Sequence, residues 1–280
     1  MIPYEYIIPC NSRSEWFCLV PIGDLHAGIK NFAENDCYEV IEWIRKTPNA
    51  YWIGMGDYAE FINYSDKRFD PYNISDWCLD SLDKLAQTQA DHICNMFSPI
   101  KNKCIGLLEG NHEETIRLKY HLSIVDIMCD HLKTVNLTDC TWIRLKFHRS
   151  NRSKNVIIFA AHGSSAAIKL GGKINKITDL GNFFEADIYL MGHVHDKASA
   201  YRPRLYITDK GEPRIYDRNK VFSLTGTFFK TYQEYTRSYG AKKLYPPTPL
   251  GVEKIRIEPF PSKWEDGKAI DEPARITIMG

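Results

Sequence analysis

The stretch F-C-L-V-P-I-G-D-L-H, residues 17–26, joins a short apolar run to a glycine and two side chains that can bind metals. Phe17–Ile22 predicts a buried strand, because the run is short, apolar and ended by a turn residue. Asp24 and His26 follow directly after that strand. The same order of strand, turn and metal-capable side chain recurs along the chain, and it determines the fold class that we expect.

Four more predicted strands end in a similar way. These strands are Tyr51–Met55, Cys104–Leu108, Val156–Ala161 and Ile188–Met191. The segments that follow them are Gly56-Asp57, Glu109-Gly110-Asn111-His112-Glu113, His162-Gly163 and Gly192-His193-Val194-His195, in that order. In open α/β sheets, ligands bind beyond the carboxyl ends of the strands. The polar side chains of all these segments should therefore converge on one crevice.

Helix-like stretches alternate with these strands, which predicts an α/β protein. The stretches are Asp36–Arg45, Asp76–Phe97 and Glu113–Leu132. After residue 197 the pattern becomes β-rich, with strands expected at Tyr201–Thr208, Arg214–Leu224 and Val252–Ile257. We expect a single domain over residues 1–280, with a helical insert at residues 60–98 near the site and a β-rich C-terminal portion at residues 199–280.

The composition excludes several classes of protein. The 280 residues include 36 Lys and Arg against 35 Asp and Glu, a balance that disfavours a dedicated nucleic-acid coat. The longest uncharged run, Val156–Ile168, is too short and too polar to span a membrane. None of the eight cysteines forms a C-x-x-C pair, which favours reduced, packed thiols. We expect a cytoplasmic protein with no membrane association, and the composition predicts no oligomeric state.

The side chains after the strands form a characteristic metal-binding set. It comprises Asp24, His26, Asp57, Asn111, His162, His193 and His195. Oxygen ligands mixed with imidazole suit Mn²⁺, Fe²⁺, Co²⁺, Ni²⁺ or Zn²⁺, and the lack of thiolate disfavours a closed structural zinc site. Seven ligands are too many for one tetrahedral ion, but with one bridging aspartate they supply four ligands to each of two ions. Two ions ~3.5–4 Å apart would activate a water and clamp both oxygens of an in-line phosphoryl displacement.

The five segments, in this order, resemble the calcineurin-like metallophosphoesterase family across residues 23–195. The resemblance implies a four-layer αββα sandwich of two mixed β-sheets flanked by helices, with the site at one sheet edge. It also implies two divalent ions, with Mn²⁺ expected first and Fe²⁺, Zn²⁺, Ni²⁺ or Co²⁺ as alternatives. The first ion would bind Asp24, His26, Asp57 and His195. The second would bind Asp57, Asn111, His162 and His193, so that Asp57 bridges the two.

The resemblance assigns catalytic roles to Asp57 and His112. His112 matches the family histidine that contacts the scissile phosphate and protonates the leaving oxygen, a role that suits a side chain titrating near neutrality. Family members that act on phosphoproteins carry arginine where this chain has Phe61 and Glu109. Two phosphate-binding guanidinium groups are therefore missing, which disfavours a protein phosphatase and favours the nuclease and phosphodiesterase branches.

We therefore predict a phosphoesterase that hydrolyses phosphodiesters of a nucleotide or nucleic-acid end through a hydroxide bridging the two metals. A phosphomonoesterase acting on a small metabolite is the first alternative, and a catalytically silent binding scaffold is the second. A scaffold should lack metal ligands or His112, and none is missing. Candidate substrate contacts are Asn111 and the lysines Lys169 and Lys173, which flank a Gly-Gly turn after the His162 segment.

Overall fold

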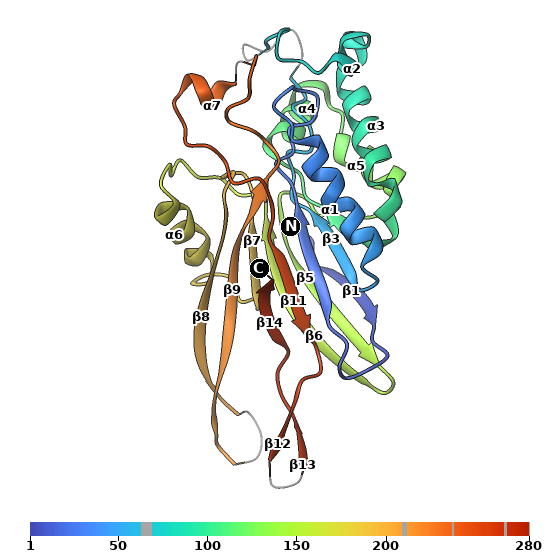
Figure 1. Cartoon of the computed structure of the whole chain (residues 1–280). Helices are drawn as coiled ribbons and strands as arrows, with labels where there is room; N and C mark the ends of the chain where they lie inside the picture. Colours follow the sequence, from blue (N-terminus) through green and yellow to red (C-terminus); the bar gives the residue numbers. More distant parts are fainter. Residues whose placement is uncertain (63–68, 209–211, 237, 266–267, 280) are drawn as a thin grey trace.

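Two mixed β-sheets packed face to face form the centre of the molecule (Figure 1). The structure, a computed structural model, describes residues 1–62, 69–208, 212–236, 238–265 and 268–279. The seven-stranded sheet has the order β1-β5-β6-β7-β9-β10, with β8 paired to β9. Its strands are β1 (Tyr4–Pro9), β5 (Cys140–Arg149), β6 (Arg152–Ala161), β7 (Ile188–Met191), β8 (Lys197–Ile207), β9 (Ile215–Thr227) and β10 (Gly251–Val252).

The second sheet has five strands in the order β14-β11-β2-β3-β4. These strands are β2 (Phe17–Ile22), β3 (Ala50–Gly54), β4 (Cys104–Leu107), β11 (Lys254–Glu258) and β14 (Arg275–Met279). A separate ribbon pairs β12 (Ser262–Glu265) with β13 (Lys268–Asp271), and it extends away from the helices together with the β8–β9 hairpin (Figure 1). The strands after residue 199 thus complete both sheets.

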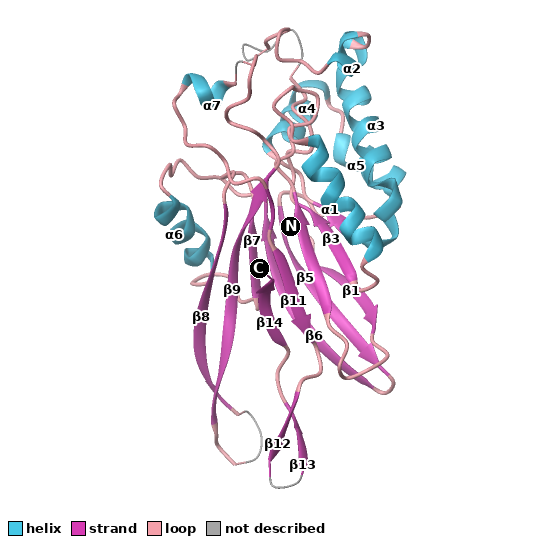
Figure 2. Ribbon diagram, in the orientation of Figure 1, coloured by secondary structure: helices cyan, strands magenta, loops and turns pink. Residues whose placement is uncertain are grey.

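Helices cover the outer face of each sheet (Figure 2). On the five-stranded sheet lie α1 (Glu34–Lys46), α3 (Leu85–Phe97), η2 (Ser98–Lys103), α4 (Asn111–Tyr120) and α5 (Ile124–Leu132). On the seven-stranded sheet lies α6 (Leu170–Leu180). The shorter elements are α2 (Asp76–Leu79), η1 (Leu82–Lys84) and α7 (Tyr239–Lys242). The predicted α/β class, with two mixed sheets flanked by helices, is confirmed.

Strand β2 shows why the apolar run Phe17–Ile22 specifies this architecture. All six of its residues are buried, because the strand has packed layers on both faces. Cys18, Val20 and Ile22 face the helices, while Phe17 and Leu19 enter the core between the two sheets. Alternate side chains of a strand point to opposite faces, so a strand in the middle of a sandwich must be apolar throughout.

The two longest predicted helices are interrupted in the structure. The stretch predicted at Glu113–Leu132 divides into α4 and α5, because His121 adopts a left-handed conformation with φ of 54° and ends α4. The hydroxyl of Ser123 then caps α5 by accepting the N–H of Asp126 at 3.3 Å. The stretch predicted at Asp76–Phe97 is likewise divided into α2, η1 and α3.

The described part of the chain contains no helix that is long and apolar enough to cross a bilayer. All eight cysteines lie in the described ranges and are free thiols, seven of them buried. Burial raises the pKa of the Cys18 thiol to about 12, so this side chain is a neutral packing group at neutral pH.

The packing of α3 and η2 on the sheet leads to a stability prediction. Trp52 of β3 is fully buried, stacks on Phe97 at 4.7 Å between ring centroids, and donates its Nε1–H to the carbonyl of Ile100 at 3.0 Å. Trp52→Ala should lower the free energy of unfolding by ~3–5 kcal/mol, measured by urea denaturation. Tyr72→Ala, at a side chain that is 80% exposed, should change it by less than ~0.5 kcal/mol. Equal unfolding midpoints for the two variants would show that this packing is wrong.

Candidate metal centre

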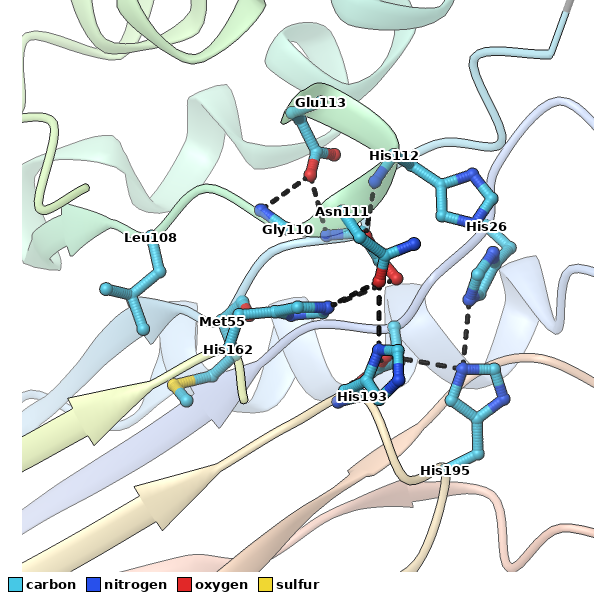
Figure 3. A network of polar contacts seen from close by, with 12 residues as sticks. His26, Met55, Leu108, Gly110, Asn111, His112, Glu113, His162, His193 and His195 are labelled. Carbon is cyan, nitrogen blue, oxygen red and sulfur yellow. Dashed lines mark hydrogen bonds and ion pairs between the residues drawn. The ribbon is translucent and has the colours of Figure 1, made fainter. Parts of the chain in front are cut away.

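The seven predicted metal ligands come together where their strands end. Figure 3 labels His26, Asn111, His162, His193 and His195 among them. Asp24 and His26 follow β2, Asp57 follows β3, and His162 follows β6. His193 and His195 lie in the loop after β7, and Asn111 begins α4 beyond β4. The loops are hydrogen-bonded to one another, since the N–H of Asp24 donates to the carbonyl of Gly56 and the N–H of Leu25 donates to that of Asp57, both at 2.9 Å.

The first group of ligand atoms comprises Asp24, His26 and His195, all within 4.8 Å of one another. His26 Nε2 lies 3.0 Å from His195 Nε2, and His195 Nε2 lies 3.3 Å from an Asp24 carboxylate oxygen. Two nitrogen ligands bound to one ion at ~2.0–2.1 Å would be separated by roughly 3.0–3.4 Å. The spacing of the two imidazoles therefore fits a shared cation.

The second group comprises Asp57, His162 and His193, and Asn111 lies beside it. His162 donates its Nδ1–H to the carbonyl of Met55 at 2.8 Å, which directs Nε2 into the site. That Nε2 is 3.3 Å from Asp57 Oδ2 and 3.1 Å from Asn111 Oδ1. His193 Nδ1 lies 2.9 Å from the same Asn111 oxygen. Atoms that are natural acceptors thus converge on one point, as they do around a metal ion.

Both aspartates are buried anions. Burial favours the neutral acid, but the hydrogen bond and charge of His195, together with the charge of His162, outweigh burial at Asp24 and lower the pKa of that carboxyl. At Asp57, His162, His112 and His26 together overcome burial and hold the pKa well below its usual range. The interaction is reciprocal, because burial would lower the pKa of His162 but the Asp57 charge raises it to about 10. The pocket around Asp24 and Asp57 is therefore stabilised by positive charge, which divalent ions would supply.

The backbone of the site is strained. Five of the seven predicted ligands have left-handed φ angles, namely Asp24 (51°), His26 (51°), Asp57 (53°), His193 (66°) and His195 (51°). A residue other than glycine rarely adopts this conformation, and each instance costs on the order of 1–3 kcal/mol unless its surroundings enforce it. One such constraint is the backbone N–H of His193, which donates to the Asp24 carboxylate at 2.9 Å. Strain of this kind concentrates at functional sites.

His112 lies next to the first group. Its backbone N–H donates to Asp57 Oδ1 at 3.0 Å, its Nδ1 donates to the carbonyl of Glu60 at 2.6 Å, and its ring is 4.8 Å from that of His26. Burial lowers the pKa of His112, but the charges of Glu60 and Asp57 outweigh burial and raise it. Nε2 is the nitrogen that remains available for a substrate.

Two carboxylates at the site were missed in the sequence. Glu113 is fully buried and accepts the N–H groups of Asp57, Tyr58 and Gly110 at 2.8–2.9 Å, and burial together with Asp57 raises its pKa to about 7. Its sequence signal is the glutamate three residues after the helix N-cap Gly110, a capping-box pattern. The Glu60 carboxylate accepts from His26 Nδ1 at 2.9 Å. Its signal is a single charge within the apolar run of residues 58–62.

The two predicted phosphate-binding lysines have different environments. Lys173 is buried, and its ammonium donates to the carbonyl of Val194 at 2.8 Å and to Asp196 at 2.7 Å. It therefore braces the loop that carries His193 and His195 from the side of α6. Lys169 is exposed at the N-terminus of α6. Contact of either lysine with substrate stays a prediction.

The solved structures to which we compare the chain resemble it remotely. No family model matches the chain, and no curated protein matches it. Among solved structures, a single mutant of Vps29 from Entamoeba histolytica aligns with 94% of this chain and 100% of its own, at 11% identity and a TM-score of 0.35. A wild-type Vps29 from the same organism, complexed with Zn²⁺, aligns at 10% identity and a TM-score of 0.35 over 94% of this chain and 99% of its own.

A further match is a conserved uncharacterized protein, described as a predicted phosphoesterase, from Streptococcus pneumoniae TIGR4. It aligns at 12% identity and a TM-score of 0.32, over 95% of this chain and 99% of its own. At such low similarity, the case for function depends on the geometry of the site.

Gly110 provides a test of how tightly the site is built. A Cβ atom at this position would lie 2.3 Å from both the backbone nitrogen and Oδ1 of Asp57, so Gly110→Ala must displace a predicted bridging ligand. We expect Gly110→Ala to weaken Mn²⁺ binding ~10–100-fold, measured by isothermal titration calorimetry. Gly171→Ala is the matched control, because a Cβ there has nothing within 4 Å. Wild-type affinity in the Gly110 variant would refute this close approach.

Proposed function

We propose that this chain is a member of the calcineurin-like metallophosphoesterase family, a dinuclear metal-dependent phosphoesterase that hydrolyses phosphodiesters of a nucleotide or nucleic acid. The observation that carries the proposal is the pair of adjacent ligand groups, Asp24, His26 and His195 on one side and Asp57, His162 and His193 on the other. We take Asp57 as the bridging ligand and Mn²⁺ as the metal, since mixed carboxylate, amide and imidazole ligands without thiolate suit that ion.

Different residues of the chain bind and orient the metals in the proposed reaction. Two bound divalent ions would polarise a phosphoryl oxygen and lower the pKa of water. Asp24 and Asp57 provide the buried negative charge that retains them. Asn111 joins the second group through its side-chain oxygen, and the carbonyl of Met55 keeps His162 Nε2 directed at the same point.

His112 serves as the general acid in this proposal. Its Nδ1 is held by the carbonyl of Glu60, which leaves Nε2 as the ring nitrogen that could contact a substrate. A proton on Nε2 is then positioned for transfer to the leaving oxygen of the ester, which is how an imidazole assists such a reaction.

The preference for diesters is supported by the residues at two positions. Phe61 is buried, at 3% exposure, and its apolar ring has no charge with which to bind a phosphate. The Glu109 carboxylate is paired with Arg117 at 2.8 Å, which leaves a neutralised acid where phosphoprotein-acting relatives have arginine. Both environments favour a substrate with less negative charge than a phosphomonoester.

The free, buried thiols agree with a reducing, cytoplasmic location.

A direct test compares hydrolysis of bis-p-nitrophenyl phosphate and p-nitrophenyl phosphate by the same protein, with added Mn²⁺ and after chelation. We expect faster diester hydrolysis, abolished by chelation and restored by Mn²⁺, because the ions provide the charge stabilisation that the reaction needs. Activity insensitive to chelation would refute the metal mechanism. Faster monoester hydrolysis would instead favour the phosphomonoesterase alternative.

The role of His112 can be separated from metal binding. His112→Ala should retain both ions, since the two groups that we take to hold them, Asp24, His26 and His195 and Asp57, His162 and His193, do not include it, and should reduce turnover by ~10²-fold or more. Metal content by atomic emission and diester turnover are the two measurements. His131→Ala, on α5, is the control and should preserve both. Full activity in the His112 variant would exclude it as the general acid.

A further inference from the structure

Glu60 lies between a candidate metal ligand and the candidate general acid. Its carboxylate oxygen Oε2 is 2.9 Å from His26 Nδ1, while its backbone carbonyl accepts from His112 Nδ1 at 2.6 Å. The ligand atoms of Glu60, His26 and His112 lie within 4.8 Å of one another. The side chains of His26 and Glu60 are only 7% and 18% exposed, so water competes weakly for their hydrogen bond.

The role of Glu60 depends on which nitrogen of the His26 ring it contacts. A carboxylate can only accept, so the proton of neutral His26 is placed on Nδ1 and the lone pair on Nε2. Nε2 is the atom that lies 3.0 Å from His195 Nε2 (Figure 3). The Glu60 carboxylate thus contacts Nδ1, the ring nitrogen of His26 that faces away from the first ligand group. An orienting partner makes this contact, whereas a second ligand of the same ion would lie on the Nε2 side.

We infer that Glu60 is a positioning residue, whose carboxylate fixes the tautomer and orientation of His26 for the ion bound by the first group. This inference rests on the proposed function, because it requires a cation at Asp24, His26 and His195. Carboxylates in this position raise the basicity of the histidine, and their removal lowers metal affinity.

The helical insert holds Glu60 in place. The N–H of Glu60 donates to the carbonyl of Ala27 at 2.9 Å, and the N–H of the next residue, Phe61, donates to Gln89 Oε1 at 2.8 Å. Gln89 is buried on α3 and packs so closely on Gly28 that a Cβ there would lie 2.0 Å from its amide nitrogen. The contact of Phe61 with Gln89 therefore links α3 to the neighbouring residue Glu60, which contacts His26 at the metal site.

The test uses the metal-stripped full chain, titrated with Mn²⁺ by isothermal titration calorimetry, with diester turnover followed over the same Mn²⁺ range. In Glu60→Ala we expect the affinity for one ion to fall ~10–100-fold, with the second ion little changed. Turnover should recover only in part at saturating Mn²⁺, because the backbone carbonyl of Glu60 still holds His112 but the negative charge beside that ring is lost. Glu60→Gln should show a smaller loss, since its amide oxygen accepts the same hydrogen bond without the charge.

Glu34→Ala is the matched control, because Glu34 also pairs with a histidine, His92, at 3.0 Å but away from the ligand groups. It should bind Mn²⁺ as the wild type does. Wild-type affinity for both ions in Glu60→Ala would overturn the inference.

Two further outcomes are distinguishable. If thermal melting shows that Glu60→Ala does not fold, the Gln variant decides: weaker binding of one ion supports the inference, and unchanged binding overturns it. If the wild type itself binds no Mn²⁺, the proposed function fails, and the inference fails with it before any variant is compared.

Discussion

The structure depends on two buried carboxylates, Asp24 and Asp57, which are held as anions at the meeting point of the two sheets. An isolated buried charge is too costly to persist, so the surroundings must compensate it. Here the compensation comes from the ligand histidines and from backbone N–H groups, including that of His193 on Asp24 and that of His112 on Asp57. The same arrangement that stabilises the two anions creates a pocket selective for cations.

The rest of the fold can be understood as support for this pocket. Strands β2, β3, β6 and β7 are each paired with neighbours inside the two sheets, and their ends present the ligands at one edge. The left-handed turns at the ligands store strain that only well-packed strands can maintain. Behind them, Glu113 binds three backbone N–H groups, and Lys173 braces the loop after β7. These contacts restrict the positions of the ligands, and such restraint lowers the cost of binding an ion.

Much of the fold could be predicted from the sequence, because the central strands are buried on both faces and are apolar throughout. The bounds of β2 and β7 agree with the prediction for this reason. Strand β5 was missed although its buried residues alternate with Arg144, Lys146 and His148, which is the period-two pattern of a half-buried strand. Its pairing with β1 bridges more than a hundred residues, and local sequence does not reveal such a pairing. The breaks after Tyr120 and at Asp80 depend on local backbone conformations that helical periodicity does not reveal.

The candidate site was predictable to the extent that it follows strand ends. Glu60 and Glu113 were missed because each acts through groups that only the folded chain brings near, the ring of His26 and the N–H groups of residues 57 and 58.

The central claim is that the two ligand groups hold one ion each. It is tested most directly by anomalous diffraction from crystals grown with Mn²⁺. The account predicts two peaks per chain, one against Asp24, His26 and His195 and the other against Asp57, Asn111, His162 and His193. A single peak, or peaks away from both groups, would contradict it.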